Sequence, residues 1–190
     1  MKNILFFGDS LTAGYGLRNA SLESLPALIQ QKINAAYLDY KVTNAGLSGD
    51  TSIGGLKRID YWTSQPISVF VLELGINDIL RRVPPQSTME NLQAIIDRVK
   101  SKYPYVKMAM MGMEVPVFLH AQVAEQFKAI YRTLAGKNQM ALVPFFLEGV
   151  AGKASLNLPD HIHPNAEGYK IIANNVWPVI QKLLVDNPES

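Results

Sequence analysis

The sequence predicts an α/β fold: a flavodoxin-like, three-layer α/β/α arrangement around a five-stranded parallel sheet. The first observation behind this prediction is that short apolar runs alternate with longer segments whose apolar residues recur at helical spacing. The second is the run Ser68–Leu74, which is almost continuously apolar, as expected of a strand covered by helices on both faces. No repeat or linker interrupts the 190 residues, so we expect one domain spanning residues 1–190.

The elements are expected in alternating order along the chain. Four consecutive apolar residues predict a first strand over Asn3–Phe7. Apolar residues at Leu25, Leu28 and Ile29 have helical spacing and predict a helix over Leu22–Tyr37. The same reasoning predicts strands at 41–44, 68–74, 106–111 and 140–143, and helices at 53–62, 89–99, 120–134 and 165–184.

Composition excludes several classes of function. The net charge is +2 and the basic residues are scattered, so we expect no nucleic-acid partner. The chain has no cysteine, which excludes disulfides, a thiolate nucleophile and cysteine-based metal sites. No apolar run approaches the roughly 18 residues of a membrane helix, so no membrane span is expected. As written, the chain is expected in the cytoplasm, or in the periplasm or outside the cell if an export signal was removed; the oligomeric state stays open.

Polar sequences follow the predicted strands at the places where ligands bind to open α/β sheets. The first strand leads into GDSLTAGYG, with Ser10 as a candidate nucleophile and Asp9 expected to support the turn. The other strands lead into NAGLSGDTS, LGIND, MEVP and PDHIHP. We therefore expect a site at the carboxyl edge of the sheet.

A phosphate-binding loop does not fit the first of these sequences. Gly8 and Gly14 lie one residue too far apart for a P-loop, and Asn19 stands where a dinucleotide fingerprint needs its third glycine. Both phosphate interpretations therefore fail on spacing.

Nucleophilic catalysis by Ser10 requires a base and oxyanion donors. Asp160 and His163 are the candidate partners of the serine. One local turn lets a carboxylate three residues earlier bind one imidazole nitrogen and leaves the other nitrogen free for the hydroxyl. A plain surface turn explains the same spacing. A metal site at Asp160, His161 and His163 lacks an obvious further ligand.

Two further residues qualify as oxyanion donors. Gly49 lacks a Cβ, so its backbone N–H can approach a substrate closely. Asn77 carries a side-chain amide that can donate to a developing negative charge. Alternatively, Gly49 belongs to an ordinary turn, and Asn77 with Asp78 caps a helix.

Taken together, these sequences resemble the four blocks of the SGNH hydrolases, also called GDSL hydrolases. The blocks are Gly8–Leu11, Asn44–Thr51, Gly75–Asp78 and Asp160–His163, in the family's order and over almost the whole chain. The resemblance implies Ser10 as nucleophile, His163 as base and Asp160 as its orienting carboxylate. It also implies an oxyanion hole made by the Ser10 and Gly49 N–H groups and the Asn77 side chain, with no metal or organic cofactor.

The runs NAGLSGDTS and LELGIND resemble more closely the branch of bacterial thioesterases, lysophospholipases and arylesterases. That branch implies a small-molecule ester or thioester substrate. Ile76 and His161 stand where glycine is usual in the branch or common in the family, which puts the substrate range in doubt more than catalysis.

An acyl pocket is expected in the loops after the third and fourth strands. The candidate substrate-binding residues are Ile76, Ile79, Leu80, Val115, Pro116 and His161. Apolar walls with few polar groups suit acyl chains or aryl esters. A carbohydrate O-acetylesterase and a catalytically inert flavodoxin-like binding module remain the alternative interpretations.

Overall fold

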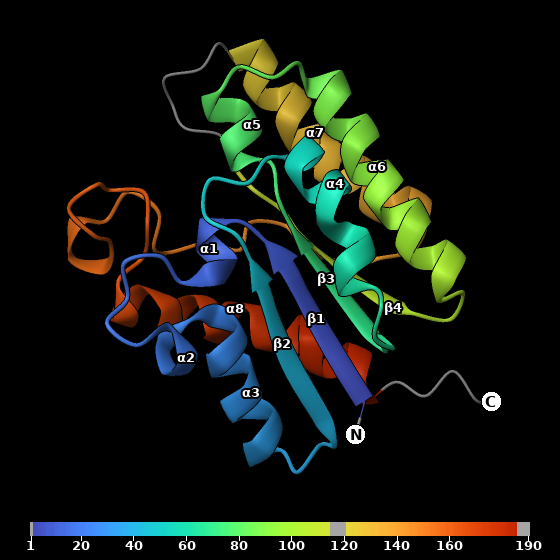
Figure 1. Cartoon of the computed structure of the whole chain (residues 1–190). Coiled ribbons are helices and arrows are strands. Elements are labelled where there is room, and N and C mark those ends of the chain that lie inside the picture. Colours follow the sequence, from blue (N-terminus) through green and yellow to red (C-terminus); the bar gives the residue numbers. More distant parts are fainter. Residues whose placement is uncertain (1, 115–120, 186–190) are drawn as a thin grey trace.

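The computed structural model, which describes residues 2–114 and 121–185, contains a five-stranded parallel sheet (Figure 1). The strands are β1 (Lys2–Gly8), β2 (Tyr40–Gly46), β3 (Val69–Glu73), β4 (Lys107–Met111) and β5 (Ala141–Val143). They stand in the order β2-β1-β3-β4-β5, and each neighbouring pair is parallel. This confirms the predicted fold class.

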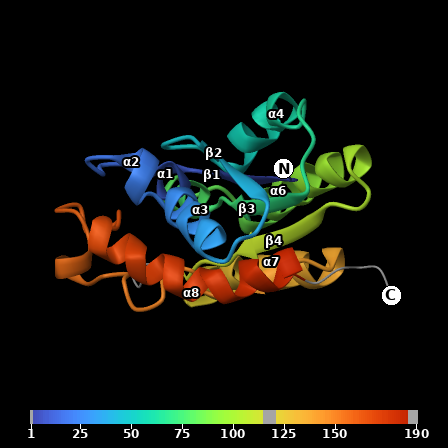
Figure 2. The same cartoon turned by 90° about the horizontal axis from the view of Figure 1, so that it is seen from below.

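Helices cover both faces of the sheet and complete the three layers. The longer ones are α3 (Leu25–Ala35), α4 (Ser52–Trp62), α6 (Pro85–Lys102), α7 (Ala121–Asn138) and α8 (Ala166–Val185). Helix α4 packs beside α6 and α6 beside α7, whereas α3 packs beside α8. Figure 2 shows α4 and α8 on opposite sides of the sheet. The short helices among the described residues are α1 (Ser10–Ala13), α2 (Ala20–Glu23), α5 (Ile76–Leu80) and the 3-10 helix η1 (Ala154–Leu156).

The predicted helix over Leu22–Tyr37 is wrong in one respect, because the structure has two helices there. Ser24 separates α2 from α3 with an extended backbone (ψ 158°), and Pro26 lies in the first turn of α3. A proline inside one continuous helix would clash with the carbonyl four residues earlier, so the chain starts a new helix instead. Helices α1 and α5 have four and five residues, too few to show a periodic pattern.

The carboxyl edge of the sheet is closely packed around the end of β1. The register pairs Gly8 with Gly46 of β2 on one side and with Glu73 of β3 on the other. A Cβ at Gly8 would overlap Thr12 Oγ1 and the Glu73 backbone oxygen, so only glycine fits there. The chain leaves β1 toward one side and crosses back to β3 on the other, which is the switch point where such sheets bind ligands.

Two buried carboxyl groups lie beneath this edge. Glu73 Oε2 accepts hydrogen bonds from the Asp9 backbone N–H at 3.2 Å and from Thr12 Oγ1 at 2.7 Å. Its Oε1 is buried and has no hydrogen-bond partner in the part of the chain that the structure describes. Burial, and after it the charge of Asp9, raises the pKa of Glu73 well above its ordinary value. Burial raises the pKa of Asp9 to about 7.

The free energy of unfolding is therefore expected to fall as the pH rises from about 4 to about 7. Because these groups hold protons more tightly when folded, their contribution is complete below the unfolded pKa and is lost as pH rises through the folded pKa. Urea titrations across this range measure the slope. Glu73→Gln should make it shallower, whereas exposed Glu90→Gln should leave it unchanged. A slope unaffected by Glu73→Gln would contradict the assignment.

Candidate active site

Ser10 stands at the carboxyl end of β1 as the first residue of α1. Asp9 caps this helix, because its Oδ1 accepts the Leu11 backbone N–H at 2.9 Å. Gly14 ends the helix in the left-handed region (φ 79°), and its N–H donates to the Ser10 carbonyl at 3.0 Å. The expectation that Asp9 supports the turn is confirmed.

Ser10 forms a hydrogen-bonded chain at this edge with two side chains from near the other end of the sequence. His163 Nε2 lies 2.9 Å from Ser10 Oγ, and His163 Nδ1 lies 2.7 Å from Asp160 Oδ2. A hydroxyl, an imidazole and a carboxylate in this order have the geometry of an activated nucleophile, a base and a group that orients the base.

The turn after Asp160 aims the imidazole. Asp160 Oδ1 accepts the backbone N–H groups of Ile162 at 2.9 Å and of His163 at 3.0 Å, while Oδ2 binds the ring. Burial opposes ionisation of Asp160, but the hydrogen bonds from the backbone and ring of His163 and from the Ile162 N–H outweigh it and lower its pKa to about 2. The turn passes through the left-handed region at His161 (φ 59°), a backbone conformation that favours glycine.

Asn77 lies in α5 and holds its amide between two acceptors. Its Nδ2 donates to Asp9 Oδ2 at 3.1 Å and to the Asp50 backbone oxygen at 2.9 Å. The N-cap of α5 is Gly75, so Asn77 does not cap its own helix. Asp78 instead accepts the Ser52 N–H at 2.8 Å, at the start of α4, whose N-cap is Thr51. The alternative that Asn77 and Asp78 cap the helix after the third strand is therefore wrong.

Gly49 lies in a turn beside Asn77. The turn is closed by the Asp50 N–H, which donates to the Leu47 carbonyl at 3.0 Å, and Gly49 has φ 78°. Arg81 Nη2 donates to the Gly49 carbonyl oxygen at 2.8 Å. The positive φ favours glycine here. Because Arg81 directly follows α5, its bond to the Gly49 carbonyl links this turn to α5.

The predicted substrate-binding residues differ in what they expose. Ile79 is 2% exposed and belongs to the hydrophobic core, whereas Leu80 is 43% exposed and Ile76 is partly buried. His161 is exposed. The other two predicted residues, Val115 and Pro116, lie outside the described residues. Leu80 is thus better placed than Ile79 to meet a substrate.

Two residues near the site were not predicted from the sequence. The Tyr15 ring packs on the His163 ring, with centroids 4.7 Å apart, and is half exposed. Arg58 of α4 is bonded to the ends of β1 and β2. No local pattern in the sequence reveals either contact, because each joins residues far apart along the chain.

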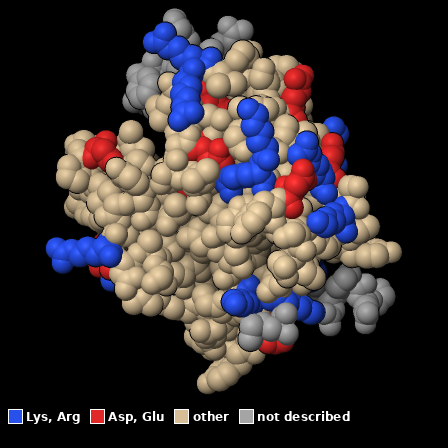
Figure 3. Space-filling model, in the orientation of Figure 1, with Lys and Arg blue, Asp and Glu red and all other residues tan. Residues whose placement is uncertain are grey.

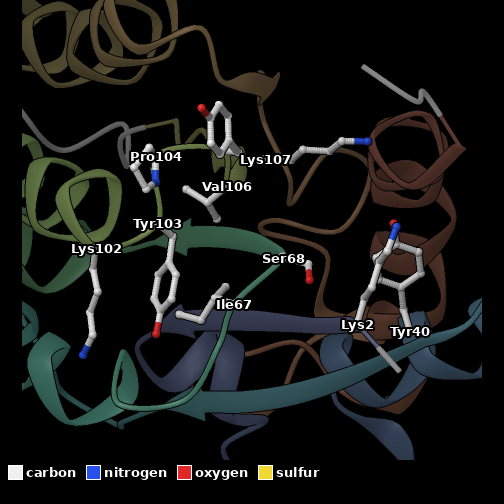
Figure 4. Close-up of a pocket in the computed structure, with 10 residues that line it drawn as sticks. Lys2, Tyr40, Ile67, Ser68, Lys102, Tyr103, Pro104, Val106 and Lys107 are labelled. Atoms are coloured by element: carbon white, nitrogen blue, oxygen red, sulfur yellow. The ribbon is translucent and has the colours of Figure 1, made fainter. Parts of the chain in front are cut away.

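A separate hollow of about 580 Å³ lies at the opposite, amino edge of the sheet (Figure 4). Its lining includes Lys2, Tyr40, Ile67, Ser68, Lys102, Tyr103, Val106 and Lys107. The three lysine ammonium groups point in different directions, and Lys107 Nζ donates to the Leu183 carbonyl at 2.8 Å. The hollow therefore offers no convergent binding group.

Charged and polar groups elsewhere in the described part of the chain form no second centre. In the described ranges, no group of three or more histidine and acidic side chains is placed to hold a metal ion. Basic and acidic side chains lie intermixed over α4 and α6 (Figure 3). Within residues 2–114 and 121–185, no helix has the length and apolarity needed to span a membrane.

Comparison with known proteins places the chain in a family. Residues 6–171 match the GDSL-like Lipase/Acylhydrolase family. Esterase TesA of Pseudomonas aeruginosa is 34% identical over 96% of this chain and 90% of its own length. Thioesterase 1/protease 1/lysophospholipase L1 of Escherichia coli is 36% identical over 95% of this chain and 84% of its own. The crystal structure of esterase EstA from Pseudoalteromonas, inhibited by monoethylphosphonate, has a TM-score of 0.89 at 30% identity, covering 98% of this chain and all of EstA. The chain therefore belongs to the GDSL-like lipase/acylhydrolase family and is a GDSL-type carboxylic ester hydrolase.

Proposed function

We propose that the enzyme hydrolyses small arylesterase- and lysophospholipase-type carboxylic esters, and thioesters, through a covalent acyl-enzyme. The observation that carries this proposal is the hydrogen-bonded relay of Asp160, His163 and Ser10. In it, His163 Nδ1 lies 2.7 Å from Asp160 Oδ2 and His163 Nε2 lies 2.9 Å from Ser10 Oγ. The half-exposed Tyr15 ring, which packs on His163, and the exposed Leu80 side chain of α5 suit an acyl or aryl group.

Acylation begins when Ser10 Oγ attacks the substrate carbonyl carbon and His163 Nε2 takes the hydroxyl proton. Asp160 keeps the other ring nitrogen protonated and stabilises the imidazolium that forms. His163 then gives the proton to the leaving alcohol or thiol as the bond from the carbonyl carbon breaks. Water attacks the acyl-enzyme with His163 again as base, which releases the acid and restores Ser10.

The developing oxyanion is held by the N–H groups of Ser10 and Gly49 and by the Asn77 amide. In the resting enzyme both Asn77 contacts are with the protein, namely Asp9 Oδ2 and the Asp50 oxygen. The longer contact, 3.1 Å to Asp9, is the one we assign to exchange for the oxyanion. Such donors act most strongly when they are fixed before the charge develops.

The proposal is tested by labelling with an alkyl fluorophosphonate followed by peptide mapping. One phosphonyl group per chain on Ser10, with parallel loss of aryl-ester hydrolysis, is the expected result. Label on another residue would refute the assignment of the nucleophile. Chain-length profiling with aryl esters, acyl thioesters and an acetylated sugar then separates the proposed substrates from carbohydrate O-acetyl groups.

Asn77→Ala is expected to lower kcat about 100- to 1,000-fold, since it removes one oxyanion donor. The change in KM should be small, because the donor acts mainly in the transition state. Steady-state kinetics on an aryl ester measure both constants. Asn175→Ala serves as the control and should leave kcat unchanged. Asn175 lies in α8, and its amide donates to the Glu148 carbonyl. Loss of less than about tenfold in Asn77→Ala would contradict the role.

A further inference from the structure

One arginine of α4 joins three segments of the carboxyl edge. Arg58 Nη2 donates to the Gly8 carbonyl at 2.8 Å, and Nη1 donates to the Ala45 carbonyl at 2.8 Å. Its Nε donates to Asp50 Oδ2 at 2.6 Å. The side chain is 18% exposed, and its Cζ lies 3.9 Å from the centroid of the Phe7 ring. The guanidinium thus has a partner on every nitrogen and an aromatic ring against its plane.

The first contact ties the nucleophile strand to the loop that follows β2. The Gly8 carbonyl accepts both Arg58 Nη2 and the Leu47 backbone N–H, the latter at 3.0 Å. Gly8 precedes Ser10 by two residues, and Leu47 precedes Gly49 by two. A shift of this carbonyl would therefore move the Ser10 and Gly49 N–H groups relative to each other.

The Asp50 contact ties the same loop to the third proposed donor. The Asp50 backbone oxygen accepts the Asn77 amide at 2.9 Å, while its carboxylate is held by Arg58. The carboxylate lies against α4 at Gly54, where a Cβ would overlap Asp50 Oδ1. Glycine at that helical position leaves room for the ion pair.

We propose that Arg58 is the positioning residue of the oxyanion hole: its guanidinium fixes the relative places of the Ser10, Gly49 and Asn77 donors. The inference rests on the proposed function, because it presumes that these groups bind the oxyanion. Arginine suits the task since a planar fork satisfies three acceptors in fixed directions, which the single ammonium of lysine does not. Arg58 itself touches no reacting atom and acts through the backbone.

Arg58→Lys is therefore expected to lower kcat about 10- to 100-fold for a short aryl ester, with KM changed less than about threefold. The positive charge is kept, so the loss reports the geometry of the fork. Affinity for an alkyl trifluoromethyl ketone, which forms a tetrahedral adduct with serine, should fall in parallel with kcat/KM. In Arg58→Ala, added guanidinium chloride at non-denaturing concentration should restore part of kcat.

Arg98 provides a matched control. Its Nη1 donates to the Leu56 carbonyl at 2.9 Å and to Asp60 Oδ2 at 3.1 Å, so it also joins a backbone oxygen and an aspartate of α4, but on the exposed surface. Arg98→Lys should keep the wild-type kcat, KM and ketone affinity. A loss of kcat in Arg98→Lys equal to that in Arg58→Lys would overturn the inference, since it would show a general effect of loosening α4.

Asp50→Asn tests the same contact from its other side. If the ion pair positions the donors, the variant that carries both Asp50→Asn and Arg58→Lys should lose no more kcat than Arg58→Lys alone, because the two changes break the same contact. Fluorophosphonate labelling of each variant separates this inference from the proposed function. Ser10 labelled in Arg58→Lys together with an unchanged kcat overturns the inference alone, whereas label on another residue overturns the proposed function.

Discussion

Ser10→Ala is expected to abolish measurable turnover, with kcat lowered by up to about a millionfold, as when the nucleophile is removed from other serine hydrolases. The alanine leaves the imidazole without a hydroxyl to deprotonate, so no acyl-enzyme forms. The His163 contact at 2.9 Å is lost, but within the described residues Ser10 Oγ makes no other hydrogen bond that holds the fold. Hydrolysis of an aryl ester at high enzyme concentration, with thermal unfolding measured alongside, gives the result.

Ser48→Ala is the matched control for this variant. Ser48 is exposed and lies next to Gly49, so its replacement removes a hydroxyl from the same edge of the sheet without touching the relay. It should keep kcat within about twofold of wild type, as surface substitutions usually do. Full esterase activity in Ser10→Ala would mean that another residue carries the chemistry, and the proposed mechanism would be wrong.

The sheet could be predicted because most of its strands appear in the sequence as short apolar runs. The run Ser68–Leu74 is apolar at nearly every position and becomes β3, with five consecutive buried residues. The position of the candidate site followed from the same prediction, since parallel strands bring their carboxyl ends to one edge. Asp160 and His163 were paired by a local turn, and the structure contains that turn.

What the sequence could not provide were contacts between residues far apart along the chain. Arg58 stands in α4, and nothing near it in the sequence indicates the carbonyls of Gly8 and Ala45 that it binds. Tyr15 and His163 meet only because the loops after β1 and before α8 lie together at the same edge. Ile79 was predicted from its apolar character alone, which does not distinguish a pocket wall from the core.

Asp160→Asn is expected to lower kcat about 10,000-fold while leaving KM and the fold nearly unchanged. The asparagine oxygen can still accept the Ile162 and His163 N–H groups, so the turn should persist. Its amide nitrogen, however, donates where the carboxylate accepted, which favours the ring tautomer with the proton on Nε2 and prevents that nitrogen from acting as base.

The pH dependence makes this prediction specific. Because the pKa of Asp160 is about 2, the carboxylate stays ionised from about pH 5 upward, and the ratio of wild-type to variant kcat should not vary through titration of this group. Profiles of kcat for both enzymes between about pH 5 and pH 8 measure that ratio. Asp97→Asn, which changes an exposed aspartate bonded to Gln93, should match wild type throughout. If Asp160→Asn kept kcat within about tenfold of wild type, the carboxylate would only shape the turn, and the base would not depend on it for its tautomer.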